Sequence, residues 1–324
     1  MIVFVKTKKF VESANKKQIL IDISINIRVK LFKKLRLGSK PFISGDTFRS
    51  ISDVKLDRLS DKSLKRASKK IEKMFLRESR QIIMFIDLHC VLDGESQNRV
   101  VAWFRERNNW TYDCISIILH NHDQVPPPEF FEEMDRLGIR CYSPNVLDNV
   151  VGVTPIPIGI ENRYFQKNGI VRHFPSNRND IGLSVQYRNV DIFGGFNVLT
   201  NPKGRRPLVE VMATYGYYVN ISALRNHRDF RKNLSTTLFV LSPPGNGIDC
   251  HRTWEAVYFG AIPVIKKGML AESLYDDLPI LATDEWDEIC SLNRVQLEAM
   301  YESIIGKPTD QAYFNYWESL IRNK

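Results

Sequence analysis

Residues 238–266 decide the fold of this 324-residue chain, and they read LFVLSPPGNGIDCHRTWEAVYFGAIPVIK. The first residues are apolar and have the composition of a buried strand, and the prolines and glycines that follow exclude regular structure. Apolar residues at helical spacing then predict a helix that ends at Gly260, because glycine adopts the left-handed conformation of that position at least cost. A second apolar run occupies 262–265. Strand, glycine loop, helix and strand together predict one unit of a parallel sheet.

The glycine loop of this unit has the chemistry of a phosphate site. Gly245 and Gly247 let backbone N–H groups converge, and the start of the helix, which Asp249 is expected to cap, adds partial positive charge. Arg252 and Glu255 lie three residues apart, so both are predicted on one face of the helix. There an arginine would neutralise a phosphate and a carboxylate would accept hydrogen bonds from ribose hydroxyls. The alternative is an ordinary βαβ unit with a solvated Arg–Glu pair, and the residues alone leave both open.

The same stretch resembles the donor-binding signature of exostosin-like glycosyltransferases and, more broadly, the C-terminal domain of GT-B glycosyltransferases. The resemblance lies in the proline–glycine loop, in the Asp249, Arg252 and Glu255 spacing, and in the Gly-x-x-Pro-Val-Ile that follows at 260–265. It implies a nucleotide-sugar donor beside this loop, with His251 among its contacts. Many retaining GT-B enzymes carry an acidic residue eight positions before the glutamate. This chain has Gly247 there, so inversion at the sugar carbon is expected.

Two polar segments in the first half of the chain supply candidate catalytic residues. An apolar strand is predicted at 41–43, and the Ser-Gly-Asp-Thr after it puts Asp46 in a polar loop, as a general base or, alternatively, as a cap or turn residue. A buried strand predicted at 114–119 runs into His-Asn-His-Asp, so His120 and Asp123 also follow a strand. Histidine suits proton transfer near neutral pH. Metal binding is the weaker alternative, because these residues are neighbours on one loop.

Both segments, together with the Ile-Pro-Ile-Gly-Ile-Glu-Asn run at 156–162, are similar to the acceptor half of bacterial polysaccharide glycosyltransferases related to the exostosin type. In the second half of the chain, residues 200–206 carry a glycine and three basic residues ahead of a helix predicted at 207–215, which favours phosphate. The resemblance implies that Arg205 or Arg206, together with Asn201, lies near the donor diphosphate. The alternative is a solvated basic cap.

Composition and charge narrow the class of protein. The chain has 43% hydrophobic residues and five scattered cysteines without a C-x-x-C pair, so we expect reduced thiols in the cytoplasm and neither disulfides nor zinc. No apolar run approaches the roughly 20 residues that span a bilayer, and the first residues lack the pattern of a secretory signal.

The net charge of +9 favours anionic partners. Basic residues cluster at 28–40 and 62–73, and the first cluster alternates with apolar residues. The alternation is compatible with peripheral contact with the anionic inner face of a membrane; a solvated amphipathic helix packed on the domain is the preferred alternative. The sequence has no RNA-binding signature and no zinc finger, so nucleic acid is not an expected partner.

Strands alternate with helices throughout, which predicts an α/β protein with doubly wound parallel sheets. The pattern includes a helix over 56–78, strands over 82–88, 151–159 and 217–221, and a linker over 163–180. The resemblance implies the GT-B arrangement, two Rossmann-like domains facing a cleft. The domains expected are 1–175 for the acceptor, 185–305 for the donor, and a C-terminal helix at 306–324 that crosses back to the first domain.

The function predicted is transfer of a sugar from a nucleotide sugar to a glycan or glycolipid acceptor, without metal or other cofactor, in the synthesis of lipopolysaccharide, O-antigen or capsule. The alternative is a non-catalytic module that binds a nucleotide sugar or a glycan. A Rossmann-type epimerase is disfavoured, because the sequence has no G-x-G-x-x-G after a first strand.

Overall fold

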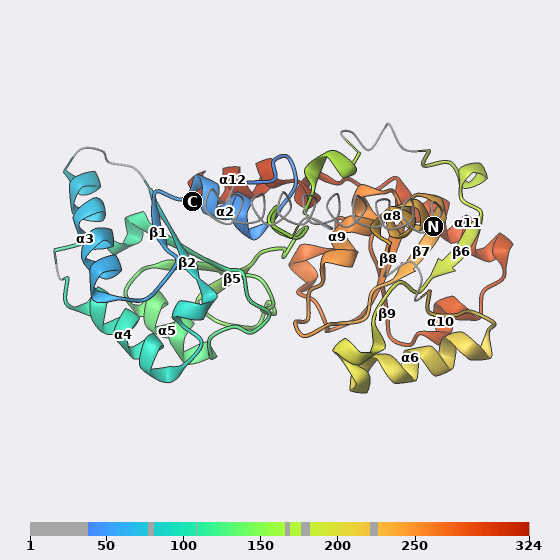
Figure 1. Ribbon diagram of the computed structural model, residues 1–324, viewed down its shortest axis with the longest axis horizontal. Helices are drawn as coiled ribbons and strands as arrows, with labels where there is room; N and C mark the ends of the chain where they lie inside the picture. Colours follow the sequence, from blue (N-terminus) through green and yellow to red (C-terminus); the bar gives the residue numbers. More distant parts are fainter. Residues whose placement is uncertain are drawn as a thin grey trace, which may run out of the picture.

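The structure is a computed structural model that describes residues 38–76, 81–107, 109–165, 169–175, 182–220 and 226–323. It is an α/β protein whose described strands form two parallel sheets, one of five strands and one of four (Figure 1). Most of the basic segment predicted at 28–40 to contact a membrane lies outside the described residues, as does part of the predicted linker at 163–180.

The five-stranded sheet follows the chain in order, and each strand is parallel to its neighbour. Right-handed crossovers that all step in one direction place their helices on one face of a sheet. In agreement, the connecting helices α3, α4 and α5 share one core with alternate residues of the strands, such as Met84 and Ile117. The elements are β1 (Val54–Leu56), α3 (Asp61–Phe75), β2 (Ile82–Asp87), α4 (Gly94–Arg105), β3 (Ile115–His120), α5 (Pro128–Arg136), β4 (Arg140–Ser143) and β5 (Val153–Pro155).

The other face of this sheet is covered by two segments that are far apart in the sequence, α2 (Gly45–Ile51) and α12 (Phe314–Asn323) (Figure 1). The rings of Phe48 and Phe314 lie 5.2 Å apart, and the Phe314 N–H donates to the Pro41 carbonyl at 2.9 Å. The strand order does not reverse among the described strands of residues 38–165, so the doubly wound pattern predicted for this half is not seen there.

The four-stranded sheet does contain a reversal. After β6 (Val190–Phe193) the chain runs through α6 (Pro202–Thr214) to Val219, which forms a parallel bridge with Gly194. It then returns through α8 to pair β7 with β6 itself, so the chain continues on both sides of one strand. Open α/β sheets bind ligands at such a switch point, beyond the carboxyl ends of the strands. The remaining elements are α8 (His227–Thr236), β7 (Thr237–Leu241), α9 (His251–Tyr258), β8 (Ile262–Lys266), β9 (Leu281–Thr283), α10 (Asp287–Cys290) and α11 (Arg294–Ile305).

The unit predicted at 238–266 is confirmed. Strands β7 and β8 are parallel neighbours joined through α9, with Leu241 opposite Val264. Helix α9 ends at Tyr258, and Gly260 beyond it has the left-handed φ of 70° that the prediction required.

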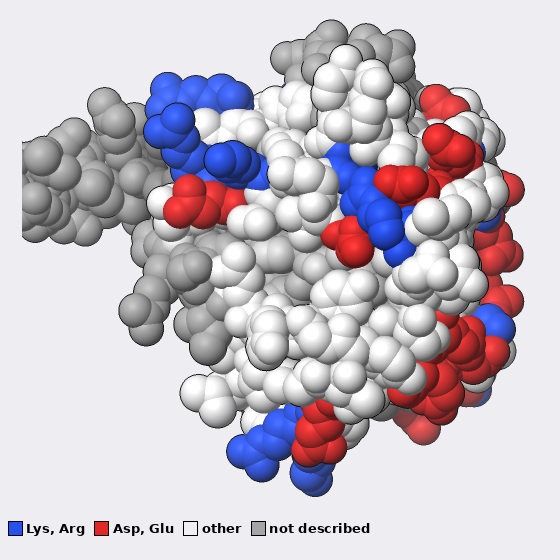
Figure 2. Space-filling view, turned by 90° about the vertical axis from the view of Figure 1, so that its right-hand side faces the viewer, with Lys and Arg blue, Asp and Glu red and all other residues white. Residues whose placement is uncertain are grey.

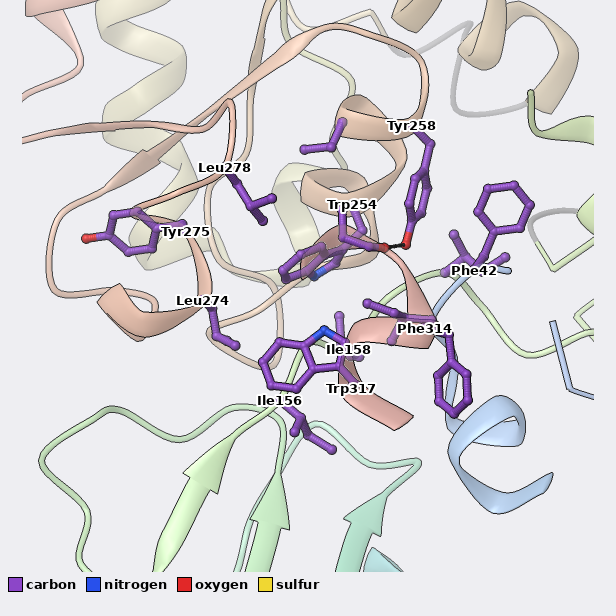
Figure 3. Packing of buried hydrophobic residues seen from close by; sticks show 14 of the residues in the cluster. Phe42, Ile156, Ile158, Trp254, Tyr258, Leu274, Tyr275, Leu278, Phe314 and Trp317 are labelled. Carbon is purple, nitrogen blue, oxygen red and sulfur yellow. Dashed lines mark hydrogen bonds between the residues drawn. The ribbon is translucent and has the colours of Figure 1, made fainter. Parts of the chain in front are cut away.

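Helix α9 also joins the two halves of the molecule. Its Trp254 and Tyr258 are buried in one cluster with Ile158 of the first half and with Phe314 and Trp317 near the C-terminus (Figure 3). The Tyr258 hydroxyl donates to the Ala312 carbonyl at 2.5 Å. Burial of a large apolar side chain stabilises a fold by about 1.5–3 kcal/mol, so this shared core fixes α9 firmly between the sheets.

Several predicted elements differ from the structure. The helix predicted at 56–78 begins only at Asp61, because residues 54–56 pair with β2 as an edge strand. The strand predicted at 151–159 is confined to Val153–Pro155, and that at 217–221 is reduced to the Val219 bridge within the described residues. Strand β4 was not predicted. Each miss is a short element that tertiary pairing defines.

The surface is charged unevenly. The basic run at 62–73 lies on α3, where six lysines and arginines are exposed: Lys62, Lys65, Arg66, Lys69, Lys70 and Lys73. Figure 2 shows the opposite end of the molecule, where acidic side chains gather along one edge. No helix within the described ranges is long and apolar enough to cross a membrane.

Candidate active site

A cavity of about 390 Å³ lies at the switch point of the four-stranded sheet. We call it the switch-point cavity. Its wall includes residues from the loops after two strands, Gly195 after β6 and Gly245 after β7, and it also includes Asp123 from the first half of the chain. Seven of the predicted donor-binding residues line it: Arg205, Gly245, Gly247, Asp249, His251, Arg252 and Glu255.

The glycine loop is held in place by the first half of the chain. A Cβ on Gly247 would lie 2.5 Å from Oδ1 of Asn145, so only glycine allows this approach. The same Asn145 oxygen accepts a hydrogen bond from the Asp249 N–H at 2.9 Å. The Gly245 N–H donates to the Gly247 carbonyl at 3.0 Å, so the loop closes on itself. Close packing explains Gly247 better than the phosphate cradle that the sequence suggested.

Asp249 does not cap helix α9, and this prediction was wrong. The N-cap is Cys250, which makes no side-chain capping hydrogen bond. The Asp249 carboxylate accepts hydrogen bonds from the Ile158 N–H at 2.8 Å and from the Trp254 indole at 2.9 Å. Burial raises the pKa of Asp249 to about 6, although these hydrogen bonds oppose the rise. The residue therefore ties the glycine loop to both the first half of the chain and α9.

Arg252 and Glu255 both face the switch-point cavity from α9, as predicted from their spacing. The Arg252 guanidinium donates to the Gly195 carbonyl at 2.8 Å and lies 5.6 Å from the Phe196 ring centre, which orients it along the cavity wall. The side chain of Glu255 is largely buried, and burial raises its pKa to about 7, with His251 and Arg252 opposing and Glu161 adding to the rise. The wall therefore carries a fixed cation beside a carboxylate that titrates near neutrality.

The two arginines predicted for the diphosphate have different positions. Arg205 is buried and lines the cavity, and its guanidinium donates to the carbonyls of Pro244 at 2.9 Å and Asn197 at 2.6 Å. Burial and the neighbouring Arg252 lower the pKa of Arg205 to about 10, so it stays charged at neutral pH. Arg206 is exposed and does not line the cavity.

Asn201 supports the site indirectly. It caps α6 by accepting from the Gly204 N–H at 3.1 Å, and its side chain also donates to the Pro244 carbonyl at 3.4 Å. It is not part of the cavity wall. Helix α6 begins at Pro202, five residues earlier than predicted, and this brings Arg205 within reach of the glycine loop.

A second cavity, of about 240 Å³, adjoins the first; we call it the neighbouring cavity. It is lined mainly by the loop after β3 and by the aromatic pair Tyr164 and Phe165. The two cavities share four wall residues, so they are contiguous; the shared residues are Asp123, Ile158, Glu161 and His251.

Glu161 and His251 face each other where the cavities meet. His251 Nδ1 lies 2.6 Å from the Gly159 carbonyl and donates to it, and Nε2 lies 3.4 Å from Oε1 of Glu161. Burial lowers the pKa of His251, but Glu161, the Gly159 carbonyl and two further carboxylates outweigh it, so the net pKa is raised. Glu161 stands within the run at 156–162, and no role of its own was predicted for it from the sequence. Its position at the end of an Ile-Pro-Ile-Gly-Ile run, after the last strand of the sheet, was the available signal.

The imidazole of His120 is held by the loop that follows β3. It is buried, and its Nδ1 accepts the Asn121 N–H at 2.8 Å. Burial lowers the pKa of His120 to about 4, with His251 adding to the effect, so the ring is neutral at physiological pH and its Nδ1 lone pair is already used. His120 therefore supports the loop and is poorly suited to accept a substrate proton. Asp123, by contrast, borders both cavities and remains a candidate base.

Asp46 lines neither of the two cavities. The strand predicted at 41–43 is a single bridge between Phe42 and Tyr313, and Asp46 lies fully buried in the first turn of α2. Its N–H donates to Oδ1 of Asn162 at 2.7 Å. Its neighbour Gly45 and its partner Asn162 line the neighbouring cavity, but Asp46 itself lines neither cavity, so the role predicted for it as a base is not supported in this arrangement.

Within the described part of the chain, no group of three or more His, Cys, Asp and Glu side chains is arranged to hold a metal ion. The histidines after β2 and β3 contact each other, since the rings of His89 and His122 lie 4.8 Å apart, edge to face. His89 Nδ1 lies 2.9 Å from the Asp87 carboxylate.

No protein-family model matches this chain, and no curated protein sequence matches it. The resemblance to exostosin-like glycosyltransferases therefore rests on the residues alone and stays a prediction. The structure shows two contiguous cavities, and a proposed function has to explain both.

Proposed function

We propose that the protein is a glycosyltransferase with the GT-B arrangement, which moves a sugar from a nucleotide sugar to a glycan or glycolipid acceptor. The observation that supports this most is the pair of contiguous cavities that meet at Asp123, Glu161 and His251. A transfer between two substrates needs two adjoining sites with reactive groups where they meet. The domains 1–175 and 185–305 correspond to the acceptor and donor sides in this proposal.

The switch-point cavity suits the donor. Arg205 and Arg252 supply positive charge at its wall, and the start of α9 adds to it. Glu255, when ionised, accepts hydrogen bonds from two ribose hydroxyls. A volume of about 390 Å³ is within the range for small-molecule sites. As the diphosphate departs, the two guanidinium groups offset the charge that develops on it, a role that a metal ion fills in other enzymes.

The neighbouring cavity suits the acceptor sugar. Tyr164 and Phe165 offer aromatic faces, with ring centres 4.4 Å apart, and Asn121 and His122 offer polar groups. Aromatic faces pack well against the apolar C–H faces of sugars, and the polar groups select hydroxyl positions. The exposed basic face of α3 would attract an anionic acceptor or the anionic inner face of a membrane. These features support surface-polysaccharide synthesis, the role that the resemblance implies.

The proposal is tested with the full chain and a panel of uridine, guanosine, cytidine and thymidine diphosphate sugars. Calorimetry measures binding, and mass spectrometry measures transfer to glycan and glycolipid acceptors. Binding followed by transfer supports a glycosyltransferase. Binding of a nucleotide sugar without transfer to any acceptor supports the non-catalytic module. Failure of every nucleotide sugar to bind contradicts the proposal.

A further inference from the structure

We propose that Glu161 is the general base of the transfer and that His251 positions it. This inference rests on the proposed glycosyltransferase function and goes further by naming the residue that takes the acceptor proton. Both side chains border both cavities, and they are 25% and 30% exposed, respectively. They are thus accessible to a substrate from either side, while each stays in contact with the other.

The backbone around Glu161 is fixed on both sides. Gly159 has a φ of 68°, and a Cβ there would lie 2.2 Å from the Ile43 carbonyl oxygen, so the chain passes closely against the segment that precedes α2. The Ile160 N–H donates to the same Ile43 carbonyl at 2.8 Å. Beyond Glu161, the Asn162 side chain donates to Oδ1 of Asn121 at 2.9 Å and accepts from the backbone of Asp46. A base held by such contacts keeps the geometry that proton transfer requires.

The surroundings of His251 favour its imidazolium form. Nδ1–H is used by the Gly159 carbonyl, so a second proton on Nε2 points to Glu161. The charged and titratable groups around the ring are Glu161 from the first half, Asp249 and Glu255 from the loop and α9, Arg252 beside it, and His120 behind. The carboxylates outnumber the cations there. His251 Nε2 lies 3.4 Å from Oε1 of Glu161, which leaves the other carboxylate oxygen for the substrate.

In the transfer step Glu161 takes the proton that the acceptor hydroxyl loses. The acceptor O–H bond breaks and its proton passes to Glu161, while the acceptor oxygen forms a bond to the anomeric carbon of the donor. The bond between that carbon and the diphosphate oxygen breaks, and its electron pair leaves with the diphosphate. Attack from the neighbouring cavity, opposite a leaving group held in the switch-point cavity, gives inversion. After product release the proton on Glu161 returns to solvent.

Four full-length variants test the proposal: Glu161→Gln, Asp123→Asn, His251→Gln and, as a matched control on the exposed face of α11, Glu302→Gln. For Glu161→Gln we expect turnover to fall by roughly 10²–10⁴-fold, with the donor Kd changed by no more than about twofold because the base acts only in the transition state. Donor binding at the wild-type level also shows that the variant is folded. Glu302→Gln should behave as wild type.

Two further readouts separate a base from a structural carboxylate. In a fifth variant, Glu161→Ala, added formate should restore part of the lost turnover, because a free carboxylate can occupy the space. In His251→Gln the pH profile of kcat/KM should change shape, because a titratable ring no longer lies beside the base. A lost structural contact would change neither.

Full turnover in Glu161→Gln, or a loss of turnover confined to Asp123→Asn, overturns the proposal and makes Asp123 the base. A loss in Glu161→Gln without formate rescue and without a change in the His251→Gln profile also overturns it. These results differ from failure of the proposed function, in which the wild-type protein itself binds or transfers no nucleotide sugar.

Discussion

Replacing Glu255 with glutamine should make the protein more stable at high pH, although it removes a functional group. The pKa of Glu255 is raised to about 7 by burial, against an ordinary value of 4.5. At 1.36 kcal/mol per pKa unit, this difference corresponds to about 3 kcal/mol. The protonated carboxyl is thus favoured in the folded state, and its contribution to stability is complete below pH 4.5 and is lost as the pH rises through about 7.

Glutamine has no charge to bury, so Glu255→Gln should exceed wild type by less than about 1 kcal/mol near pH 5 and by up to about 3 kcal/mol at pH 8.5. Urea unfolding at both pH values, without ligand, measures the difference. Glu302→Gln on the exposed surface of α11 serves as the control and should show the same stability as wild type at both pH values. The reasoning is refuted if Glu255→Gln and wild type differ by the same amount at pH 5 and pH 8.5.

Three further outcomes follow from the same geometry. Arg205→Met should raise the donor KM by about tenfold or more, because a charge-assisted contact with the donor is lost. Arg206→Met should leave the donor KM unchanged, because Arg206 is exposed and does not line the cavity. Equal effects of the two substitutions in steady-state kinetics would contradict this. Gly247→Ala should lower the free energy of unfolding in urea by about 1–3 kcal/mol, as overpacking does generally. The additional substitution Asn145→Ala should restore most of this loss, since Asn145 is the group that a Cβ would meet. If the double variant instead loses the sum of the two single effects, the clash is not the cause. Donor affinity measured by calorimetry should fall as the pH drops through about 7, because protonated Glu255 no longer accepts two hydroxyl hydrogen bonds; a flat profile would exclude Glu255 as the ribose partner.

The part of the fold that could be predicted from sequence is local. Between residues 237 and 266 the chain changes from strand to loop to helix to strand, and each change has its own signal, such as the left-handed glycine at Gly260. Arg252 and Glu255 share a face for a reason of spacing alone. The short strands β1 and β4 have no comparable signal, because pairing with long neighbours makes them strands.

The parts that could not be predicted depend on contacts between distant residues. Asp249 has the sequence position of a helix cap, but its carboxylate bonds to the backbone of Ile158, 91 residues earlier in the chain. Asp46 follows a glycine in an apparently polar loop, yet it lies fully buried in α2, where its N–H donates to Asn162, 116 residues later in the chain. Glu161 lies 3.4 Å from His251, and no sequence spacing relates these two residues. These relations exist only once the two sheets have packed together.

The most direct test of donor binding beside α9 is to measure, by calorimetry, the affinity of nucleoside diphosphate sugars for the wild-type protein and for Glu255→Ala. The measurement is made at pH 8, where Glu255 is ionised. At least one nucleotide sugar should bind the wild-type protein, and the alanine variant should bind it at least about tenfold more weakly, since charge-assisted hydrogen bonds to the ribose are lost. Absence of binding by every nucleotide sugar, or equal binding by both proteins, would contradict the placement of an activated sugar at this wall of α9.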